Sequence, residues 1–396
     1  MRRLRILQIF SRYLQYGGEE GSVFRIGDAL QDAHDVEYFI GSTQDLLGPA
    51  PFDFLKIPFR SWYNFTAAQR LRRYQEIGQF DLWQIHNVFP GLSPSVYQTA
   101  FDLQIPIVHF LHNYRMSCTN GFFINHGSPC ERCIHGNFWP ALQTACWRDS
   151  HLASGMTGLI LRRFRSMRLF EKVSAWIALS HASKAKHIQM GIPEERIHVV
   201  PHFYQLTGTP PPPCPSGDVL FLGRLSSEKG VDFLLKAWAQ IETGTRKLVI
   251  AGTGPEESKL RKLAADLHLR NVEFTGFLQP EQQKKFWRKS AFFVAPSIWD
   301  EPFGMVVLEA WSKGRPVVGF AKGSFPEMIS EGHDGTLARE VTPQALAERI
   351  SFLLKNPSLV ESWGRHGLAK LEHFASKTRW ISSMEAVYRS SLPLLN

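Results

Sequence analysis

The sequence lacks an apolar run long enough to cross a membrane, and it has few cysteines. No uninterrupted apolar window approaches the ~18 residues that a membrane-spanning helix needs. Gln8, Ser11 and Arg12 interrupt the apolar stretch after the basic N-terminus too early for a signal peptide. We therefore expect a cytoplasmic protein whose five cysteines are thiols or metal ligands before they are disulfides.

Two further absences concern phosphate binding. The chain has no Asp-x-Asp, so a diphosphate held by magnesium or manganese is not indicated. The turn Gly252-Thr253-Gly254 has no third glycine at dinucleotide spacing, so a nicotinamide fingerprint is weak. The net charge of +9 is not concentrated in a basic tail, which favours anionic ligands over a dedicated nucleic-acid arm.

The chain does have a repeated alternation of short apolar runs and amphipathic segments. This pattern predicts an α/β protein with parallel sheets wrapped by helices. The predicted strands are Arg5–Phe10, Val36–Ile40, Leu82–His86, Ile105–Leu111, Trp176–Leu179, Ile197–Val200, Val219–Leu222, Lys247–Ala251, Val272–Phe274, Phe292–Ala295 and Pro316–Gly319. The predicted helices include Gly21–Ala33, Phe65–Ile77, Leu159–Phe170, His181–Met190, Val231–Gln240, Glu256–Leu267 and Gln282–Lys289.

A proline-rich stretch divides this alternation into two halves. Four consecutive prolines within 206–216 cannot continue a helix or a central strand, so we expect a stiff linker there. Because 396 residues exceed what one core usually supports, we predict two doubly wound, Rossmann-like domains, at 1–205 and 217–375, that face a central cleft.

Two loops of the second half have the features of an anion site. Arg224 and Lys229 lie between a strand and a helix, where they and the helix N-terminus can hold phosphate. Further on, a helix is predicted to begin at Gly304, with Glu301 just before it. The amides of Gly304, Met305 and Val306 would then be available to ligand oxygens.

Glu309 lies inside that predicted helix, where its carboxylate can accept two hydrogen bonds from a vicinal diol. For each of these groups a plain structural interpretation is about as good on spacing alone. Arg224 and Lys229 can be surface cations, Glu301 can favour the helix dipole, and Glu309 can lie on a solvated face.

Taken together, the motifs resemble the retaining glycosyltransferases of family 4, which have the GT-B fold. The resemblance rests on their order along nearly the whole chain. In that order the matching segments are Tyr16–Leu30, Gly223–Gly230, Ala251–Glu256, Val272–Leu278, Ala295–Ser297, the pair Glu301 and Glu309, and Gly323–Ile329. It also implies that residues 376–396 form a C-terminal helix that crosses back to the first domain.

The resemblance implies a function and a role for each matching residue. The protein would move a sugar from a nucleotide-sugar donor to an acceptor hydroxyl, with no cofactor required for catalysis. The acceptor would be a glycan or a lipid-linked glycan, in cell-surface polysaccharide or lipopolysaccharide synthesis. Arg224 and Lys229 would bind the diphosphate, Glu309 the ribose, and Phe277 and Leu278 would border the base. Glu301 with Gly304, Met305 and Val306 would bind the transferred sugar, His112 would meet that sugar, and Gly17 and Gly18 would let the backbone approach the phosphates.

The sequence also departs from the family pattern. Asn113 follows His112 where the family often has Asp, which weakens a general base at that position. No clear nucleophile for a double displacement is present. Front-face attack needs only positioning and charge stabilisation, and we favour it for that reason.

A segment at about 113–150 contains four of the five cysteines: Cys118, Cys130, Cys133 and Cys146. Their spacing fits a tetrahedral, structural zinc site. Reduced structural thiols and disulfides formed on exposure are the two rival interpretations.

The basic, apolar-rich segment 158–172 can lie on an anionic membrane, or it can be an ordinary helix with a solvated basic face. A peripheral position at the inner membrane face would follow from the first interpretation. At the level of function two alternatives also stay open. They are a zinc-containing nucleic-acid-binding protein and a phosphorylase with the same fold.

Overall fold

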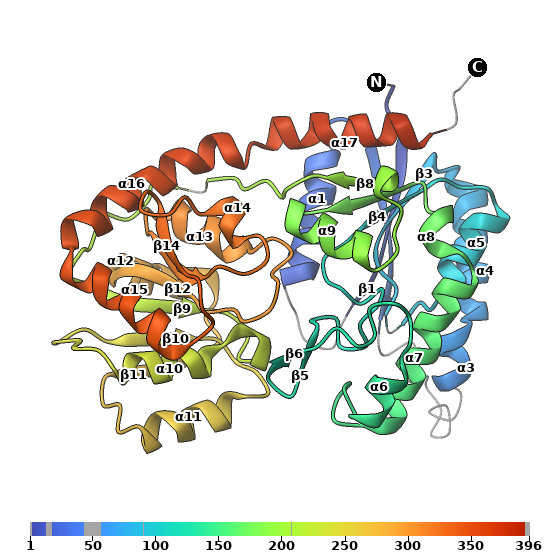
Figure 1. Ribbon diagram of the computed structural model, residues 1–396. Coiled ribbons are helices and arrows are strands. Elements are labelled where there is room, and N and C mark those ends of the chain that lie inside the picture. The colour runs from blue at the N-terminus through green and yellow to red at the C-terminus, as the bar shows by residue number, and fades with distance from the viewer. Residues whose placement is uncertain (1, 13–17, 43–56, 90, 207, 393–396) are drawn as a thin grey trace. The chain divides into compact units, whose positions relative to one another are not determined.

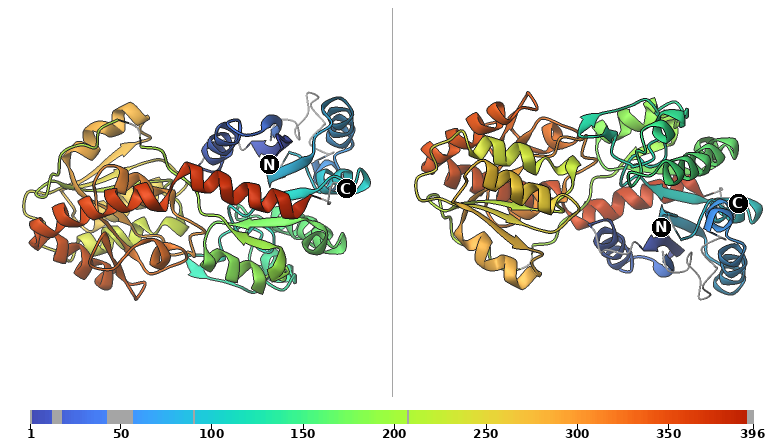
Figure 2. Two further views of the ribbon diagram at one scale, coloured as in Figure 1. Left: turned by 90° about the horizontal axis from the view of Figure 1, so that it is seen from above. Right: turned by 90° about the horizontal axis from the view of Figure 1, so that it is seen from below.

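The computed structural model describes residues 2–12, 18–42, 57–89, 91–206 and 208–392. The chain forms two compact units, and helices lie on both faces of the sheet in each of them (Figures 1 and 2). Unit 1 comprises Met1–Val200 and Thr378–Asn396, and unit 2 comprises Pro201–Lys377. The structure therefore divides the chain after residue 200, whereas the sequence predicted the first domain to end at 205.

Unit 1 is built on a six-stranded parallel sheet in the order β2-β1-β3-β4-β7-β8. The chain moves outward from β1 to β2 and then returns to the other side of β1 to form β3. The sheet therefore has its topological switch point between β1 and β3. The strands are β1 (Arg5–Arg12), β2 (Asp35–Ser42), β3 (Leu82–Asn87), β4 (Ile107–Phe110), β7 (Ala175–Ala178) and β8 (Ile197–Val199).

Side-chain caps fix where several helices of unit 1 begin. Asn64, Ser150 and Ser180 accept hydrogen bonds from first-turn amides of α4, α7 and α9. The helices of this unit are α1 (Gly18–Leu30), α3 (Ile57–Trp62), α4 (Phe65–Gly78), α5 (Ser95–Asp102), α6 (Trp139–Gln143), α7 (His151–Ser166), α8 (Leu169–Lys172), α9 (His181–Gln189) and α17 (Lys377–Ser391).

The predicted helix Leu159–Phe170 is wrong as a continuous helix. Helix α7 ends at Ser166, and Arg168 adopts a left-handed conformation with φ of 53° before α8 begins. Arg165 is half-buried and donates to Ser117 Oγ (2.8 Å) and to the carbonyl oxygens of Ile134 (2.9 Å) and Met190 (3.0 Å). This arginine ties the cysteine segment to α7, so it is not part of a solvated basic face.

Unit 2 is built on a second six-stranded parallel sheet, in the order β11-β10-β9-β12-β13-β14. Its switch point lies between β9 and β12. The strands are β9 (Asp218–Leu222), β10 (Leu248–Ala251), β11 (Val272–Gly276), β12 (Ser290–Ala295), β13 (Val317–Phe320) and β14 (Gly335–Ala338). The regular helices are α10 (Val231–Trp238), α11 (Glu257–Asp266), α12 (Pro280–Lys289), α13 (Met305–Ser312), α14 (Phe325–Met328), α15 (Pro343–Lys355) and α16 (Pro357–Phe374).

The proline-rich stretch is packed onto unit 2. The side chain of Arg315 is buried and donates to the carbonyl oxygens of Pro212 (2.8 Å) and Trp287 (3.0 Å). Tyr204 donates its amide to the carbonyl of Ala375 (3.0 Å). The described residues of this stretch therefore belong to the second unit.

Helix α17 packs on unit 1, although unit 2 precedes it in the chain. Trp380, Met384 and Tyr388 are buried, and the hydroxyl of Tyr388 donates to Oε1 of Gln84 on β3. The last helix thereby contributes to the core of unit 1.

Candidate functional site

The carboxyl ends of β9 and β12 bring together two of the charged residues that the sequence predicted for the donor. Lys229 ends the 3-10 turn Ser227–Lys229 after β9, and Glu301 lies in the loop after β12. Because these strands are parallel neighbours, their loops meet at one edge of the sheet. Lys229 Nζ lies 2.5 Å from Glu301 Oε1, which also accepts from Ser297 Oγ at 2.8 Å.

A further acid in this region was missed by the sequence reasoning. Glu228 is buried, accepts a hydrogen bond from Ser226 Oγ (2.6 Å) and pairs with Arg224 at 3.4 Å. The carbonyl oxygen of Glu228 accepts from the amide of Ile298 (3.0 Å), which links the two loops. The only sequence signal for Glu228 was its position within the motif Gly223–Gly230.

Helix α13 begins where the sequence predicted, after Gly304. Gly304 has φ of 89°, and a Cβ there would lie 2.5 Å from the ring of Phe325. Glycine is therefore required on both conformational and steric grounds. Met305 and Val306 occupy the first turn, where amide groups lack partners within the helix and the helix dipole favours anions.

The other predicted donor residues lie elsewhere on the same unit. Glu309 is half-buried on α13, one turn past its start, and its charge acts on Lys313 one turn further on. Leu278 is buried and Phe277 is 60% exposed, both directly after β11 at the edge of the sheet. Leu278 and Phe277 therefore follow the edge strand, whereas Glu309 belongs to the helix after β12.

In unit 1, a carboxylate lies at the corresponding switch point. Glu19, in the first turn of α1, accepts hydrogen bonds from the side-chain amides of Asn87, the last residue of β3, and Asn113 after β4. The Asn113 contact is 3.3 Å, and Asn113 Oδ1 accepts from the amide of Arg115 (2.9 Å). Burial raises the pKa of Glu19 even though these amides and the charge of Arg115 oppose that shift.

His112, the predicted sugar contact, lies beside this cluster. Its Nε2 is 2.9 Å from Nδ1 of His86, whose Nε2 is 2.7 Å from Oε1 of Gln8. Because Oε1 can only accept, His86 carries its proton on Nε2 and accepts from His112 through Nδ1. Burial and the nearby charge of Arg25 lower the pKa of His112 to about 3, so the ring is neutral at physiological pH.

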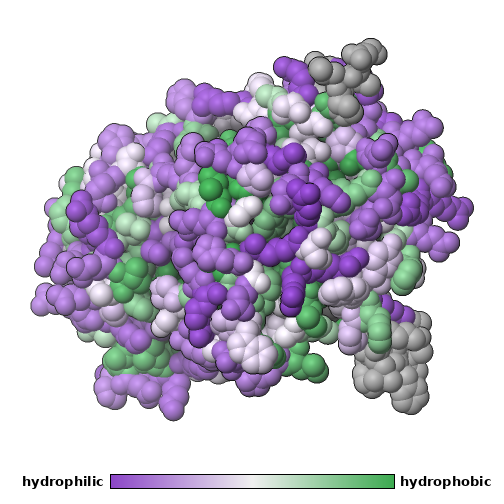
Figure 3. Space-filling model, turned by 45° about the vertical axis from the view of Figure 1, so that its right-hand side comes forward, coloured by the Kyte–Doolittle hydropathy of each residue, from purple (hydrophilic) through white to green (hydrophobic). Residues whose placement is uncertain are grey.

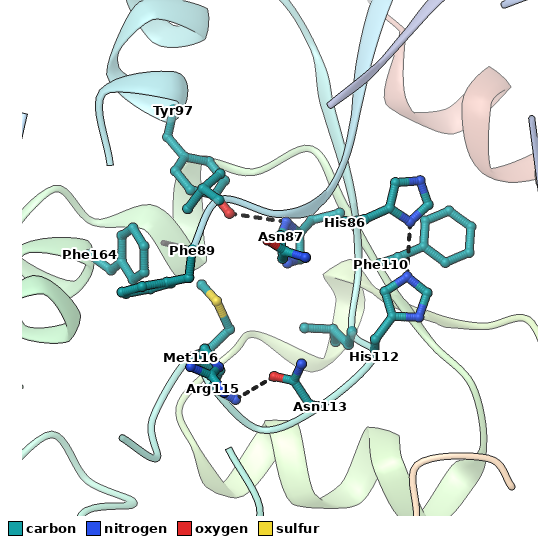
Figure 4. A pocket seen from close by; sticks show the side chains of 13 residues that line it. His86, Asn87, Phe89, Tyr97, Phe110, His112, Asn113, Arg115, Met116 and Phe164 are labelled. Atoms are coloured by element: carbon teal, nitrogen blue, oxygen red, sulfur yellow. Dashed lines mark hydrogen bonds between the residues drawn. The ribbon is translucent and has the colours of Figure 1, made fainter. Parts of the chain in front are cut away.

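His112 lies in the lining of one pocket of unit 1 (Figure 4). The polar side chains of the lining include His86, Asn87, His112, Asn113 and Arg115, and Phe110 stacks on the two histidines, whereas Phe89, Tyr97 and Phe164 lie together on another side. Of the two glycines predicted to approach phosphate, Gly17 lies outside the described residues. Gly18 is the first residue of α1, and a Cβ there would meet no atom of the described residues within 4 Å.

The cysteine segment folds into a short antiparallel hairpin, β5 (Ile124–Asn125) with β6 (Ser128–Pro129), followed by α6. All the cysteines are unpaired as thiols, and the four of this segment line a single cavity. Burial raises the pKa of Cys133 to about 12. Asn120 lies between two of the thiols, accepting from Cys118 Sγ (3.0 Å) and donating to Cys146 Sγ (3.2 Å).

The four thiols of the predicted zinc site are therefore close together, but they are not arranged around a point where an ion could bind. Four thiols are a set that zinc prefers. Within the described part of the chain, however, no group of three or more His, Cys, Asp or Glu side chains is placed to hold a metal ion. Asn120 would have to leave its position between Cys118 and Cys146 for an ion to reach both thiols.

Among the described residues, no helix is both long and apolar enough to cross a bilayer. The face drawn in Figure 3 is mostly hydrophilic, with hydrophobic side chains exposed in separate small areas.

Two parallel α/β units with polar groups at their switch points define a protein of the GT-B class, and comparisons with known proteins agree. The profile described as Glycosyltransferase Family 4 matches residues 16–207, and the profile described as Glycosyl transferases group 1 matches residues 214–369. The chain belongs to the glycosyltransferases of family 4.

Solved structures support the fold. The chain is similar to the Anabaena protein HepE in complex with UDP and glucose (TM-score 0.71, 19% identity, covering 98% of this chain and 100% of that one). It is also similar to a sucrose-phosphate synthase from Thermosynechococcus elongatus (TM-score 0.72, 19% identity, 98% of both chains).

A curated relative, an uncharacterized glycosyltransferase of Methanocaldococcus jannaschii, is 36% identical over 140 residues, which are 35% of this chain and 36% of that protein. The chain spans between about a third and a half of the length of such relatives.

Proposed function

We propose that the protein is a retaining glycosyltransferase that moves a sugar from a nucleotide-sugar to an acceptor hydroxyl. The observation that carries this proposal is the contact of Lys229 with Glu301 beside the start of α13. A cation that can bind a diphosphate, a carboxylate that can accept from sugar hydroxyls and a helix N-terminus at one sheet edge support the proposal. The structural neighbour bound to UDP and glucose supports a nucleotide-sugar as the donor class.

The residues of unit 2 suit departure of a diphosphate without a catalytic metal. As the bond from the sugar to the diphosphate breaks, negative charge grows on the leaving oxygen. Arg224, Lys229 and the first amides of α13 can stabilise that charge. Glu301, held by Lys229 and Ser297, is positioned to accept hydrogen bonds from the transferred sugar. Front-face attack, in which the departing phosphate takes the proton of the acceptor hydroxyl, retains the configuration.

In unit 1, neutral His112 acts as a hydrogen-bonding group. With its pKa at about 3 it carries no charge at neutral pH. It can therefore contact a sugar hydroxyl without adding a cation beside the reaction centre. The chain of contacts to His86 and Gln8 fixes the orientation of its ring.

We further propose a glycan or lipid-linked glycan as the acceptor, in cell-surface polysaccharide or lipopolysaccharide synthesis, with peripheral contact to an anionic membrane. Helices α3 and α7 lie against each other and expose apolar side chains: Phe59 is 78% exposed, Leu152 82% and Leu159 56%. Arg162 is exposed on α7 beside them. Exposed apolar groups next to arginine suit an interface with acidic headgroups.

The donor half of the proposal is tested by thermal shift with UDP, GDP and ADP, followed by hydrolysis assays with the matching nucleotide-sugars. We expect one nucleoside diphosphate to raise the melting temperature and its sugar conjugate to be hydrolysed slowly. No protection by any of the three, together with salt-sensitive retention on DNA, would overturn the proposal. Activity that requires inorganic phosphate would indicate a phosphorylase instead.

The membrane contact is tested by sedimentation with vesicles of phosphatidylglycerol or phosphatidylcholine. We expect binding to the acidic vesicles only, weakened by high salt and by the double change Phe59→Ser and Leu159→Ser. Phe352→Ser, at an exposed position on α15 of unit 2, is the matched control. Equal binding of both vesicle types, or none, would contradict the contact.

A further inference from the structure

Glu19 is a carboxylate that the proposed reaction has not yet used. It lies at the switch point of unit 1, between β1 and β3, and ligands of open α/β sheets bind at such points. Asn87 and Asn113, which donate to its two oxygens, both line the pocket that contains His112 (Figure 4).

The surroundings of Glu19 are unfavourable for a purely structural ion. Its two hydrogen-bond donors are neutral amides, and Arg115 acts on it only through its charge. Glu19 is half-buried, and a carboxylate that is partly removed from water with only neutral donors carries a cost in free energy. The same burial raises its pKa, a property that is common where side chains act on ligands.

The cluster also has acceptor capacity that no group among the described residues uses. A carboxylate oxygen has two lone-pair positions, and each oxygen of Glu19 accepts one amide hydrogen bond. Asn87 is only 7% exposed, and its Oδ1 has no hydrogen-bond partner within the described residues. The missing partners are hydrogen-bond donors, and hydroxyl groups supply them.

We propose that Glu19, together with Asn87 Oδ1, binds the acceptor by accepting hydrogen bonds from two or more of its hydroxyl groups. This inference rests on the proposed function and assigns the binding of the proposed glycan acceptor to particular residues of unit 1. Glu19 is then a residue for acceptor recognition. The proton of the attacking hydroxyl still leaves with the phosphate.

The test uses the donor identified by thermal shift and two kinds of acceptor probe: p-nitrophenyl glycosides of common hexoses and a membrane lipid extract. Glu19→Gln replaces one accepting oxygen by a donor and keeps the shape. We expect it to lower kcat/KM for the acceptor about 10- to 100-fold, the range for losing a charged hydrogen bond. Protection by the nucleoside diphosphate should stay as in the wild type, because the donor residues lie in unit 2.

A second variant separates recognition from folding. The double variant Glu19→Gln with Asn113→Asp exchanges the positions of the carboxylate and the amide. The amide at position 19 can then donate to the carboxylate at position 113. We expect kcat/KM of this double variant to be at least about tenfold higher than that of Glu19→Gln. Glu37→Gln, which removes the same charge from an exposed pair with Arg5 at 3.2 Å, is the control and should behave as wild type.

The outcomes are distinguishable. If Glu19→Gln leaves kcat/KM near the wild-type value, the inference is wrong while the proposed function stands. If both Glu19 variants lose activity and nucleotide protection together, Glu19 is structural and the inference also fails. If the wild type transfers to neither kind of probe and hydrolyses no donor, the proposed function itself is overturned, and the inference with it.

Discussion

Lys229 and Glu301 form an ion pair, and this pair fixes the position of both side chains. Their separation is 2.5 Å, and Lys229 is only 25% exposed. A cation already held by a carboxylate cannot drift into solvent, so it is oriented for an incoming phosphate at little further cost in side-chain entropy. The carboxylate in turn is held in place for the sugar.

We predict that Lys229→Met lowers the affinity for the nucleoside diphosphate about 10- to 100-fold, because it removes one charge-assisted hydrogen bond. Isothermal titration calorimetry measures this directly. Lys236→Met is the matched control, since Lys236 pairs with Asp232 on the exposed side of α10. Equal affinity in the two variants would mean that Lys229 does not face the phosphates.

The proposed contact of Glu309 with the ribose leads to a second prediction. If the Glu309 carboxylate accepts hydrogen bonds from both ribose hydroxyls, Glu309→Gln should weaken nucleotide binding about tenfold. The variant should also bind the 2′-deoxy nucleotide about as well as the ribonucleotide, whereas the wild type should prefer the ribonucleotide. A variant with unchanged affinity and unchanged preference would remove Glu309 from the site. Glu257→Gln, on the exposed pair with Arg261, controls for charge.

At the scale of elements, we predict that the cysteine segment binds zinc. Four thiols line one cavity, and an ion that bound all of them would displace Asn120 from Cys118 and Cys146. We expect metal analysis of the purified protein to find about one zinc per chain. The double variant Cys130→Ser with Cys133→Ser should abolish zinc binding and lower the melting temperature. Cys214→Ser, outside the segment, should do neither, and zinc-free wild type would contradict the site.

The sequence predicted most strands of both sheets, because apolar runs of about four to eight residues between polar loops are typical of buried strands. It missed β14, whose run Gly335–Ala338 is short and contains Gly and Thr. The break at Arg168 was also missed, since no Gly or Pro announces its left-handed conformation.

The same contrast holds for the candidate sites. Residues of unit 2 could be predicted because Arg224, Lys229 and Glu301 belong to local motifs. Glu19 could not, because its partners lie 68 and 94 residues away in the chain. Only the strand order of unit 1, which one sequence does not reveal, brings the start of α1 together with the end of β3 and the segment after β4.

At the scale of the whole molecule, the two units differ in how protonation acts on their stability. Among the described residues, the histidines with lowered pKa values are His34, His109, His112, His187 and His198, and all of them belong to unit 1. The buried side chains of His109 and His187 have pKa values of about 3 and about 4, which burial lowers from the usual 6.5. Both rings are therefore neutral in the folded unit at about pH 5 and charged in the unfolded chain.

The lowered histidine pKa values make unit 1 less stable in acid. Above about pH 6.5 both states are neutral and the free energy of unfolding is unaffected. As the pH falls from about 6.5 towards about 4, the unfolded chain binds protons that folded unit 1 cannot, and the stability of unit 1 is lost. The loss at about pH 5 is about 2 kcal/mol for each buried histidine.

We therefore predict that scanning calorimetry shows the transition of unit 1 moving to lower temperature between about pH 7 and about pH 5, away from that of unit 2. The transition of unit 2 is identified as the one that the bound nucleoside diphosphate raises directly. His187→Gln can keep a donor towards the carbonyl of Ser183, which His187 Nδ1 contacts at 2.8 Å, and should reduce the pH dependence of unit 1. His126→Gln, at an exposed position, should leave that dependence unchanged. If both transitions shift equally, the buried histidines of unit 1 do not govern its acid sensitivity.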